Sequence, residues 1–390
     1  MEFTRRDFGK LAMATVPAAA GLSIPGMARA AQSSKIDGVQ IGAITYSFRG
    51  SPAQGGVAAA DMPAAMQKIG LSEVELMSGD AEIIAGIPPA PGRGGGGFGG
   101  GRGGSGRGGG GGFGRGGGAG ASGAEVALAP NGCPANTPSG RDSIAKAGGA
   151  APAAGRGGGG RGPATMTPEQ EAAQKAIADW KMAANASTWK GVKQKFNDAG
   201  VEVQILCYNM SLNTTPEEMD YAFQMARDLG VRAMSCSTTV AVAKKVAPFA
   251  DKYKIMWAGH GHANIYDPEE FARPETFAEI MAFSKYIGVN LDIGHFTQAG
   301  FDAVAYIPQI HDRITNIHLK DSMKPDKCGV AGPTQPWGMG QTPIKEVLLM
   351  MKKNKYTFPA NIELEYRIPD GSDSATEVGK CFEFAKKCFA

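Results

Sequence analysis

The sequence predicts an α/β protein whose core is a closed (β/α)8 barrel. Apolar segments of strand length alternate eight times with segments of helical periodicity, in units of about 25 to 35 residues. Of the 390 residues, roughly 285 remain once a targeting segment and a low-complexity stretch are set aside, close to the ~250 of one barrel. A doubly wound open sheet is the alternative, but no Gly-x-Gly-x-x-Gly occurs in a strand-to-helix turn.

Residues 1–30 have the features of an export signal. Thr4-Arg5-Arg6-Asp7-Phe8-Gly9-Lys10 resembles the twin-arginine pattern, a weakly apolar segment follows, and Ala28-Arg29-Ala30 is typical of a cleavage site. This resemblance implies the twin-arginine export machinery as a partner and a periplasmic location. No apolar stretch reaches the ~18 uncharged residues of a confident membrane span, so we expect no membrane association after signal cleavage.

The first barrel unit is predicted from a strand over 39–46 and a helix over 61–69, with Gly70 as its stop. Tyr46 would lie at the mouth of the barrel, where we expect it to contact substrate. The second strand, 74–77, contains one acid, Glu75. We predict that Glu75 also contacts substrate at the mouth, with a solvated carboxylate at a strand end as the alternative.

Residues 88–162 interrupt the pattern with Gly, Ala, Arg and Pro. Such a composition buries too little apolar surface to offset its ordering entropy, so we expect a disordered insertion after the second strand. The barrel domain would then comprise residues 31–87 and 163–390. Arg-Gly-Gly units can bind single-stranded nucleic acid, but an exported protein lacks that partner, so we predict no nucleic-acid binding. The six cysteines contain no CxxC pair, and we expect buried or loop residues.

The remaining elements alternate regularly. The expected helices cover residues 167–199, 215–229, 240–253, 274–287, 301–309, 344–353 and 374–388. The expected strands cover residues 201–207, 231–236, 255–258, 289–292, 314–318 and 360–365.

Imidazole and carboxylate groups follow the last four strands. The segments are His260-Gly-His262, Asp292-Ile-Gly-His295, His318-Leu-Lys320-Asp321 and Glu363. The carboxyl ends of barrel strands meet at one face, and these side chains are typical ligands of a divalent metal. We therefore predict a metal site at the barrel mouth.

These segments, with Trp337-Gly-Met-Gly340 and Ile362-Glu363, resemble the xylose-isomerase-like TIM barrels, also called the sugar phosphate isomerase/epimerase or AP-endonuclease-family-2 group. The resemblance implies Mn2+, Mg2+, Co2+ or Zn2+ bound by Glu, Asp, His and Glu at four strand ends. Asp292, His318 and Glu363 match the last three ligands, and Glu365 is the alternative to Glu363. His260 occupies the position of the first Glu, which puts a symmetric two-carboxylate mechanism in doubt.

The resemblance implies an isomerase or epimerase that transfers a proton next to a carbonyl group through an enediolate, with a sugar or glycoside as substrate. Glu363 would be the general base, and His295 and His262 would contact substrate. Lys320 would neutralise developing negative charge or form a salt bridge to Asp321 or a neighbouring acid. Trp337 would cover a sugar ring or anchor its loop.

Three other functions remain open. The first is a metal-dependent lyase or hydrolase of 3-keto-glycosides, which shares the enediolate chemistry. The second is a non-catalytic carbohydrate-binding barrel. The third is a phosphodiesterase resembling the barrel endonucleases, which needs more ligands than five histidines readily supply. The sequence leaves the oligomeric state open, including a homo-oligomer.

Overall fold

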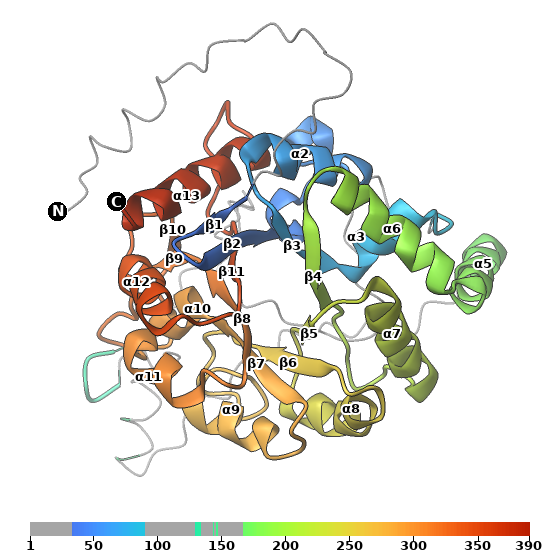
Figure 1. Cartoon of the computed structure of the whole chain (residues 1–390). Helices are drawn as coiled ribbons and strands as arrows, with labels where there is room; N and C mark the ends of the chain where they lie inside the picture. Colours follow the sequence, from blue (N-terminus) through green and yellow to red (C-terminus); the bar gives the residue numbers. More distant parts are fainter. Residues whose placement is uncertain (1–32, 90–128, 134–142, 144–145, 147–166) are drawn as a thin grey trace, which may run out of the picture.

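The computed structural model describes residues 33–89, 129–133, 143, 146 and 167–390. Its central feature is a closed barrel of eight parallel strands, surrounded by helices (Figure 1). The barrel closes because the first strand, β2, pairs in parallel with both β3 and the last strand, β11. The predicted (β/α)8 barrel is therefore confirmed.

The barrel strands, in chain order, are β2 (Val39–Ile44), β3 (Glu73–Met77), β4 (Glu202–Cys207), β5 (Ala233–Cys236), β6 (Met256–His260), β7 (Ile287–Asp292), β8 (Ile314–Leu319) and β11 (Ala360–Ile362). The α-helices are α2 (Met62–Ile69), α3 (Ser78–Ala85), α5 (Pro168–Ala183), α6 (Ala186–Asp198), α7 (Pro216–Leu229), α8 (Val240–Tyr253), α9 (Pro274–Met281), α10 (Ile293–Gln298), α11 (Ala303–Ile310), α12 (Ile344–Asn354) and α13 (Ser374–Cys388). Three 3-10 helices, η1 (Thr45–Phe48), η2 (Pro52–Gln54) and η3 (Ala59–Asp61), and three two-residue strands, β1 (Lys35–Ile36), β9 (Asp321–Ser322) and β10 (Thr334–Gln335), complete the described elements.

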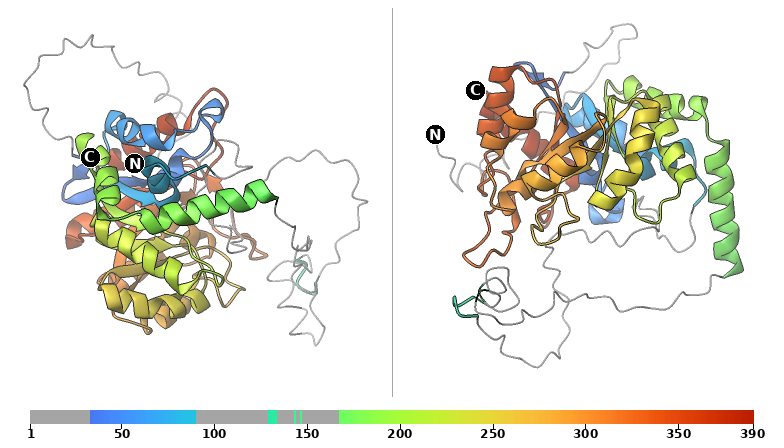
Figure 2. Two further views of the ribbon diagram at one scale, coloured as in Figure 1. Left: turned by 90° about the vertical axis from the view of Figure 1, so that its right-hand side faces the viewer. Right: turned by 90° about the horizontal axis from the view of Figure 1, so that it is seen from below.

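Helix boundaries follow local capping chemistry. Thr215 accepts a hydrogen bond from the backbone of Glu218 at the start of α7, and Gly230 ends that helix in the left-handed conformation. The single helix expected over 167–199 is instead two helices, because Asn185 is extended and caps α6 through the backbone N–H of Ser187. Helix α5 buries none of its residues and projects beyond the ring of helices (Figure 2).

Two other expectations about element boundaries were wrong. The helix expected over 274–287 ends at Met281, and Ile287 already belongs to β7. The last strand, expected to reach Glu365, ends at Ile362, so Glu363 directly follows it. A short helix that was not predicted, α10, begins after Asp292.

The expected signal, residues 1–30, and most of the expected insertion, residues 88–162, lie outside the described residues. Within that insertion, residues 129–133 form a turn in which Ala129 and Cys133 bond through their backbones. Cys133 forms a disulfide with Cys328, which lies in the loop between β8 and α12. Both cysteines are buried, as expected, but their pairing was not predicted. Among the described residues, no helix has the length and apolarity needed to cross a membrane.

Candidate metal centre

Four predicted ligands converge at one end of the barrel. His260 and Asp292 are the last residues of β6 and β7, His318 lies in β8, and Glu363 follows β11. Each offers a ligand atom, and these four atoms all lie within 4.8 Å of one another. All four side chains are buried. The structure thus assembles the set that the strand ends suggested, with Glu363 rather than Glu365 as its second carboxylate.

Three buried polar atoms of this set have no hydrogen-bond partner among the described residues: Asp292 Oδ2, His318 Nδ1 and Glu363 Oε2. Leaving such atoms unpaired away from water costs about 1–3 kcal/mol each, and more when they are charged. Two imidazoles and two carboxylates are a donor set that suits Zn2+ and neighbouring divalent metals. The unpartnered atoms therefore fit a divalent cation held between the four side chains.

The Asp-x-Gly-His segment orients its aspartate. Asp292 caps α10, because its Oδ1 accepts a hydrogen bond from the backbone N–H of His295 at 2.8 Å. That bond leaves Oδ2 directed to the ligand set. Glycine is required at position 294, because a Cβ atom there would lie 2.8 Å from Cβ of Lys320.

Lys320 is the positive centre of the site. Its Nζ lies 2.8 Å from both Asp292 Oδ2 and Glu363 Oε2, at ion-pair distance but without hydrogen-bond geometry. It donates a hydrogen bond to Glu365 Oε2 at 2.6 Å and lies 2.9 Å from His295 Nε2. Lys320 is only 1% exposed, so it is a member of the site and not a surface lysine.

Below the ligand set lies a layer of buried polar residues. Glu75 is completely buried, and its Oε2 is 2.6 Å from His318 Nε2 and 2.7 Å from Asn316 Nδ2. Its contacts are with the barrel interior, so its position favours support of His318 over the substrate contact expected for it. Glu73 and Glu75 both point into the barrel along β3 and are completely buried, so the expected contact of Glu75 with substrate stays a prediction.

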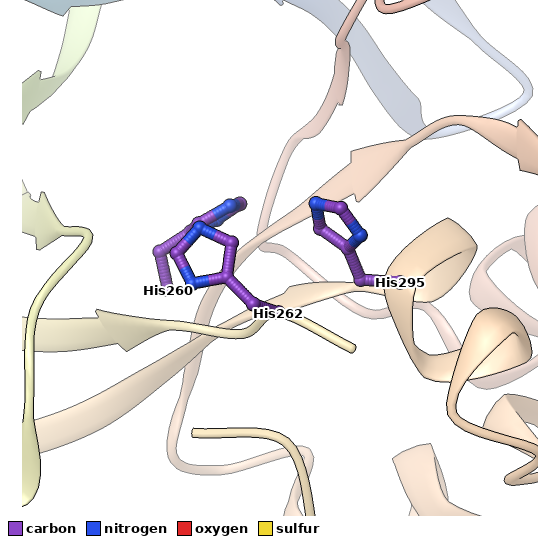
Figure 3. Close-up of side chains that lie close together, drawn as sticks. All are labelled: His260, His262 and His295. Atoms are coloured by element: carbon purple, nitrogen blue, oxygen red, sulfur yellow. The ribbon is translucent and has the colours of Figure 1, made fainter. Parts of the chain in front are cut away.

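Three histidines form a second group that shares His260 (Figure 3). His260, His262 and His295 each offer a nitrogen, and these atoms lie within 4.8 Å of one another. However, both ring nitrogens of His295 already have partners, Gln298 Oε1 at 2.6 Å and Lys320 Nζ at 2.9 Å. We therefore regard His262 and His295 as polar groups next to the metal set rather than as further ligands.

Burial keeps these imidazoles neutral. It lowers the pKa of His260 well below its usual value, with neighbouring His318 acting in the same direction. It also lowers the pKa of His262 and of His295, and the charge of Lys320 adds to both effects. A neutral imidazole can bind a metal or exchange a hydrogen bond with a substrate oxygen.

The remaining groups of the site are strongly perturbed. Burial raises the pKa of Asp292 to about 7, against the opposing effect of Lys320. Burial disfavours the charged forms of Glu363, His318 and Lys320. For each of these groups, neighbouring groups of opposite charge outweigh burial and stabilise the charged form. The pKa of Glu363 is accordingly well below its usual value, and the pKa values of His318 and Lys320 are well above theirs. Such clustered perturbation is characteristic of functional sites.

Two predicted substrate contacts lie in different surroundings. Tyr46 lies in η1, next to the site. Burial raises the pKa of Tyr46, and the nearby charges of Glu365 and Glu363 raise it further but less strongly. Trp337 is 1% exposed and packs edge-on against Phe384 of α13. Its position favours a loop anchor over a cover for a sugar ring, because its ring faces the outer helix.

The sequence suggested Asp321 as an ion-pair partner of Lys320, but Lys320 pairs with Asp292, Glu363 and Glu365, and Asp321 holds a loop instead. Its Oδ2 accepts hydrogen bonds from the backbones of Gly338 and Gly340, both at 2.8 Å. A Cβ atom at position 340 would lie 2.1 Å from Asp321 Oδ1, which explains the second glycine of Trp-Gly-Met-Gly. The sequence contains both partners, an acid directly after Lys320 and a glycine-rich loop further along the chain. Their contact could not be predicted, because only folding brings the loop back to the acid.

Residues 151–388 match the family model described as "Xylose isomerase-like TIM barrel". No curated protein matches the chain. A sugar phosphate isomerase/epimerase from Parabacteroides distasonis is similar at 14% identity and a TM-score of 0.47, over 96% of this chain and 99% of that one. The probable 3-DHS dehydratase AsbF from Bacillus anthracis is similar at 10% identity and a TM-score of 0.49, over 88% and 97%. An IolI protein structure with zinc is similar at 10% identity and a TM-score of 0.49, over 90% and 96%.

Proposed function

This chain belongs to the xylose isomerase-like TIM barrel family, and we propose that it is a divalent-metal-dependent isomerase or epimerase of a sugar or glycoside. One observation carries the proposal. His260, Asp292, His318 and Glu363 bring ligand atoms within 4.8 Å of one another, and three buried atoms of these side chains have no hydrogen-bond partner among the described residues. The two imidazoles favour Zn2+, Co2+ or Mn2+ over Mg2+.

The bound cation would supply Lewis acidity to a carbonyl and hydroxyl oxygen of the substrate. The surrounding residues would move the proton. Glu363 is the proposed general base, because its carboxylate belongs to the ligand set and is ionised. Lys320 stands beside it as a donor to an oxygen that gains negative charge on the way to an enediolate, and His295 Nε2, which faces Lys320, would accept a hydrogen bond from a substrate hydroxyl.

His260 changes the symmetry of this chemistry. It leaves the ligand set with two carboxylates and two imidazoles. Glu365 is a further carboxylate at the site, outside the ligand set, and its side chain is 17% exposed. We propose that Glu365, through its hydrogen bond with Lys320, is the second proton carrier of an epimerase.

We also propose that the mature protein acts in the periplasm, exported by the twin-arginine machinery. The pattern around Arg5-Arg6 motivates this proposal. The Cys133–Cys328 disulfide supports it independently, because disulfides persist mainly in oxidising compartments. A periplasmic enzyme would act on free sugars or glycosides, since phosphorylated intermediates are kept in the cytoplasm.

The test combines metal analysis with isotope exchange. The purified mature protein is analysed for bound metal and then incubated with keto-sugars and 3-keto-glycosides in D2O. Deuterium incorporation next to the carbonyl, without cleavage, is the expected result. Release of an aglycone would contradict the isomerase and would show a lyase or hydrolase of 3-keto-glycosides. Absence of both metal and exchange would overturn the enzyme assignment and favour a non-catalytic carbohydrate-binding barrel.

A further inference from the structure

We propose that Glu75 is a positioning residue that holds His318 in the orientation and tautomer needed to bind the metal through Nδ1. The inference rests on the proposed metal centre and adds a residue from the opposite wall of the barrel. Glu75 belongs to β3 and His318 to β8, 243 residues apart in the chain. Both side chains are buried, and the contact between them is 2.6 Å.

The surroundings of Glu75 are built to hold an ionised carboxylate. Its Oε2 contacts His318 Nε2 and accepts a hydrogen bond from Asn316 Nδ2 at 2.7 Å. Its Oε1 accepts hydrogen bonds from the Ser235 hydroxyl and from Asn290 Nδ2, the latter at 3.4 Å. A buried charge is tolerated when it is fully hydrogen-bonded, and these donors from β5, β7 and β8 meet that condition.

The amide of Asn316 has only one orientation that satisfies its neighbours. Its Oδ1 accepts from the Thr315 hydroxyl at 2.9 Å, and its Nδ2 donates to Asn361 Oδ1 at 3.0 Å as well as to Glu75. The donor side of Asn316 therefore faces Glu75. An ionised carboxylate only accepts hydrogen bonds, so His318 Nε2 must carry the proton of the 2.6 Å contact.

The state of Nδ1 then follows. Asn290 Nδ2 lies 3.1 Å from His318 Nε2, but a nitrogen that donates to Glu75 cannot accept from Asn290. With the proton on Nε2, the lone pair of a neutral His318 is on Nδ1. That atom is buried, has no hydrogen-bond partner among the described residues, and lies 3.2 Å from Glu363 Oε2. Without a metal, a proton on Nδ1 would face Glu363 Oε2 across this contact, and a bound metal would take the place of that proton.

The same strand offers a matched control. Glu73 is also completely buried in the barrel interior, and its Oε2 accepts a hydrogen bond from Asn361 Nδ2 at 2.6 Å. None of its hydrogen bonds or ion pairs among the described residues involves His318. Glu73→Gln and Glu75→Gln therefore make the same substitution at two buried positions of one strand, and only Glu75 contacts the candidate ligand His318.

The experiment measures Zn2+ binding to the metal-free mature protein by competition with a chelator, together with thermal unfolding of each metal-free variant. Glu75→Gln should weaken Zn2+ binding about 10- to 100-fold, as loss of a carboxylate behind a metal-bound histidine does elsewhere, whereas Glu73→Gln should change it less than about threefold. A folded Glu75→Gln protein with unchanged Zn2+ affinity, or an equal loss in Glu73→Gln, would overturn the inference.

A second measurement needs no variant and covers the case in which Glu75→Gln does not fold. Long-range 1H–15N spectra of the Zn2+-loaded wild-type protein, labelled on histidine, distinguish the metal-bound nitrogen of each ring. We expect coordination of His318 through Nδ1 with a proton on Nε2, and coordination through Nε2 would contradict the inference. Wild-type protein that binds none of Zn2+, Co2+ and Mn2+ would instead sink the proposed metal centre itself.

Discussion

The Nζ atom of Lys320 lies 2.8 Å from Oε2 of Glu363, so a buried ammonium group directly contacts a candidate metal ligand. The same nitrogen lies 2.8 Å from Asp292 and 2.6 Å from Glu365. Lys320 therefore balances three carboxylates at the barrel mouth. A bound divalent cation would take over part of that role, which couples the stability of the site to its metal.

Lys320→Met should destabilise the metal-free protein by about 3–5 kcal/mol, because removal of one partner leaves buried charges uncompensated. Addition of Zn2+ or Mn2+ should stabilise this variant more than the wild type. In the variant the cation is the only positive charge that neutralises the carboxylates, because the ammonium group of Lys320 is missing. Thermal unfolding with and without metal measures both effects. Lys324→Met, at an exposed position of the following loop, is the control that should respond to neither. Equal metal-induced shifts in the wild type and Lys320→Met would refute this account of the site.

Glu363→Gln and Glu365→Gln should separate metal binding from proton transfer. Glu363 belongs to the ligand set and Glu365 does not, so only Glu363→Gln should weaken metal binding strongly, by about 100-fold or more. Glu365→Gln should keep the metal and lose deuterium exchange into a keto-sugar by about 10²–10⁴-fold. Metal content by elemental analysis and exchange rates by NMR give the two readouts. Loss of metal in Glu365→Gln, with metal kept in Glu363→Gln, would show that Glu365 is the metal ligand and that Glu363 is not.

The barrel and its four candidate ligands could be predicted because both depend on local signals. Strand-length apolar segments mark the eight strands, and a ligand at the end of a strand, such as His260 or Asp292, is placed by the barrel geometry itself. The same reasoning does not fix which groups Glu75 contacts. Alternation shows that it faces inward, but the depth of an inward-facing residue depends on the stagger between strands, which the sequence does not display.

Interactions between distant segments could not be predicted for a related reason. Lys320 reaches His295 and Glu365 because its flexible side chain passes over Gly294, a route set by packing and not by spacing. Cys133 and Cys328 are separated by 195 residues, and composition marked the first of them as part of a disordered insertion. Pairing over such a separation needs the fold, because cysteine spacing alone does not specify connectivity.

The mature protein isolated from an oxidising compartment should contain four free thiols. Cys207, Cys236, Cys381 and Cys388 are unpaired and buried, and the other two cysteines are bridged. Thiol titration of the denatured, unreduced protein should therefore give four, and Cys328→Ser should give five because Cys133 is released. Six thiols in the wild type would contradict both the disulfide and the support it gives to export.

Asp80 should make the stability of the protein depend on pH outside the metal site. Burial raises the pKa of this carboxyl from its usual value of 3.8 to about 6, although the Thr45 hydroxyl donates a hydrogen bond to it at 2.6 Å. Because its pKa is raised, the folded protein binds the proton more tightly than the unfolded chain does. Its contribution to stability is therefore fully present below pH ~4 and is lost as pH rises through about 6, by about 3 kcal/mol in total.

Asp80→Asn removes this titration and keeps an oxygen that can accept from Thr45. The variant should therefore be more stable than the wild type at pH 7.5, by up to about 3 kcal/mol, and the difference should shrink towards pH 4. Chemical denaturation of both proteins across this range measures the difference directly. Asp198→Asn, at an exposed position of α6, controls for the loss of a negative charge and should give a difference independent of pH. A constant difference for Asp80→Asn as well would show that the pKa of Asp80 is the same in the folded and unfolded protein, and that burial does not raise it.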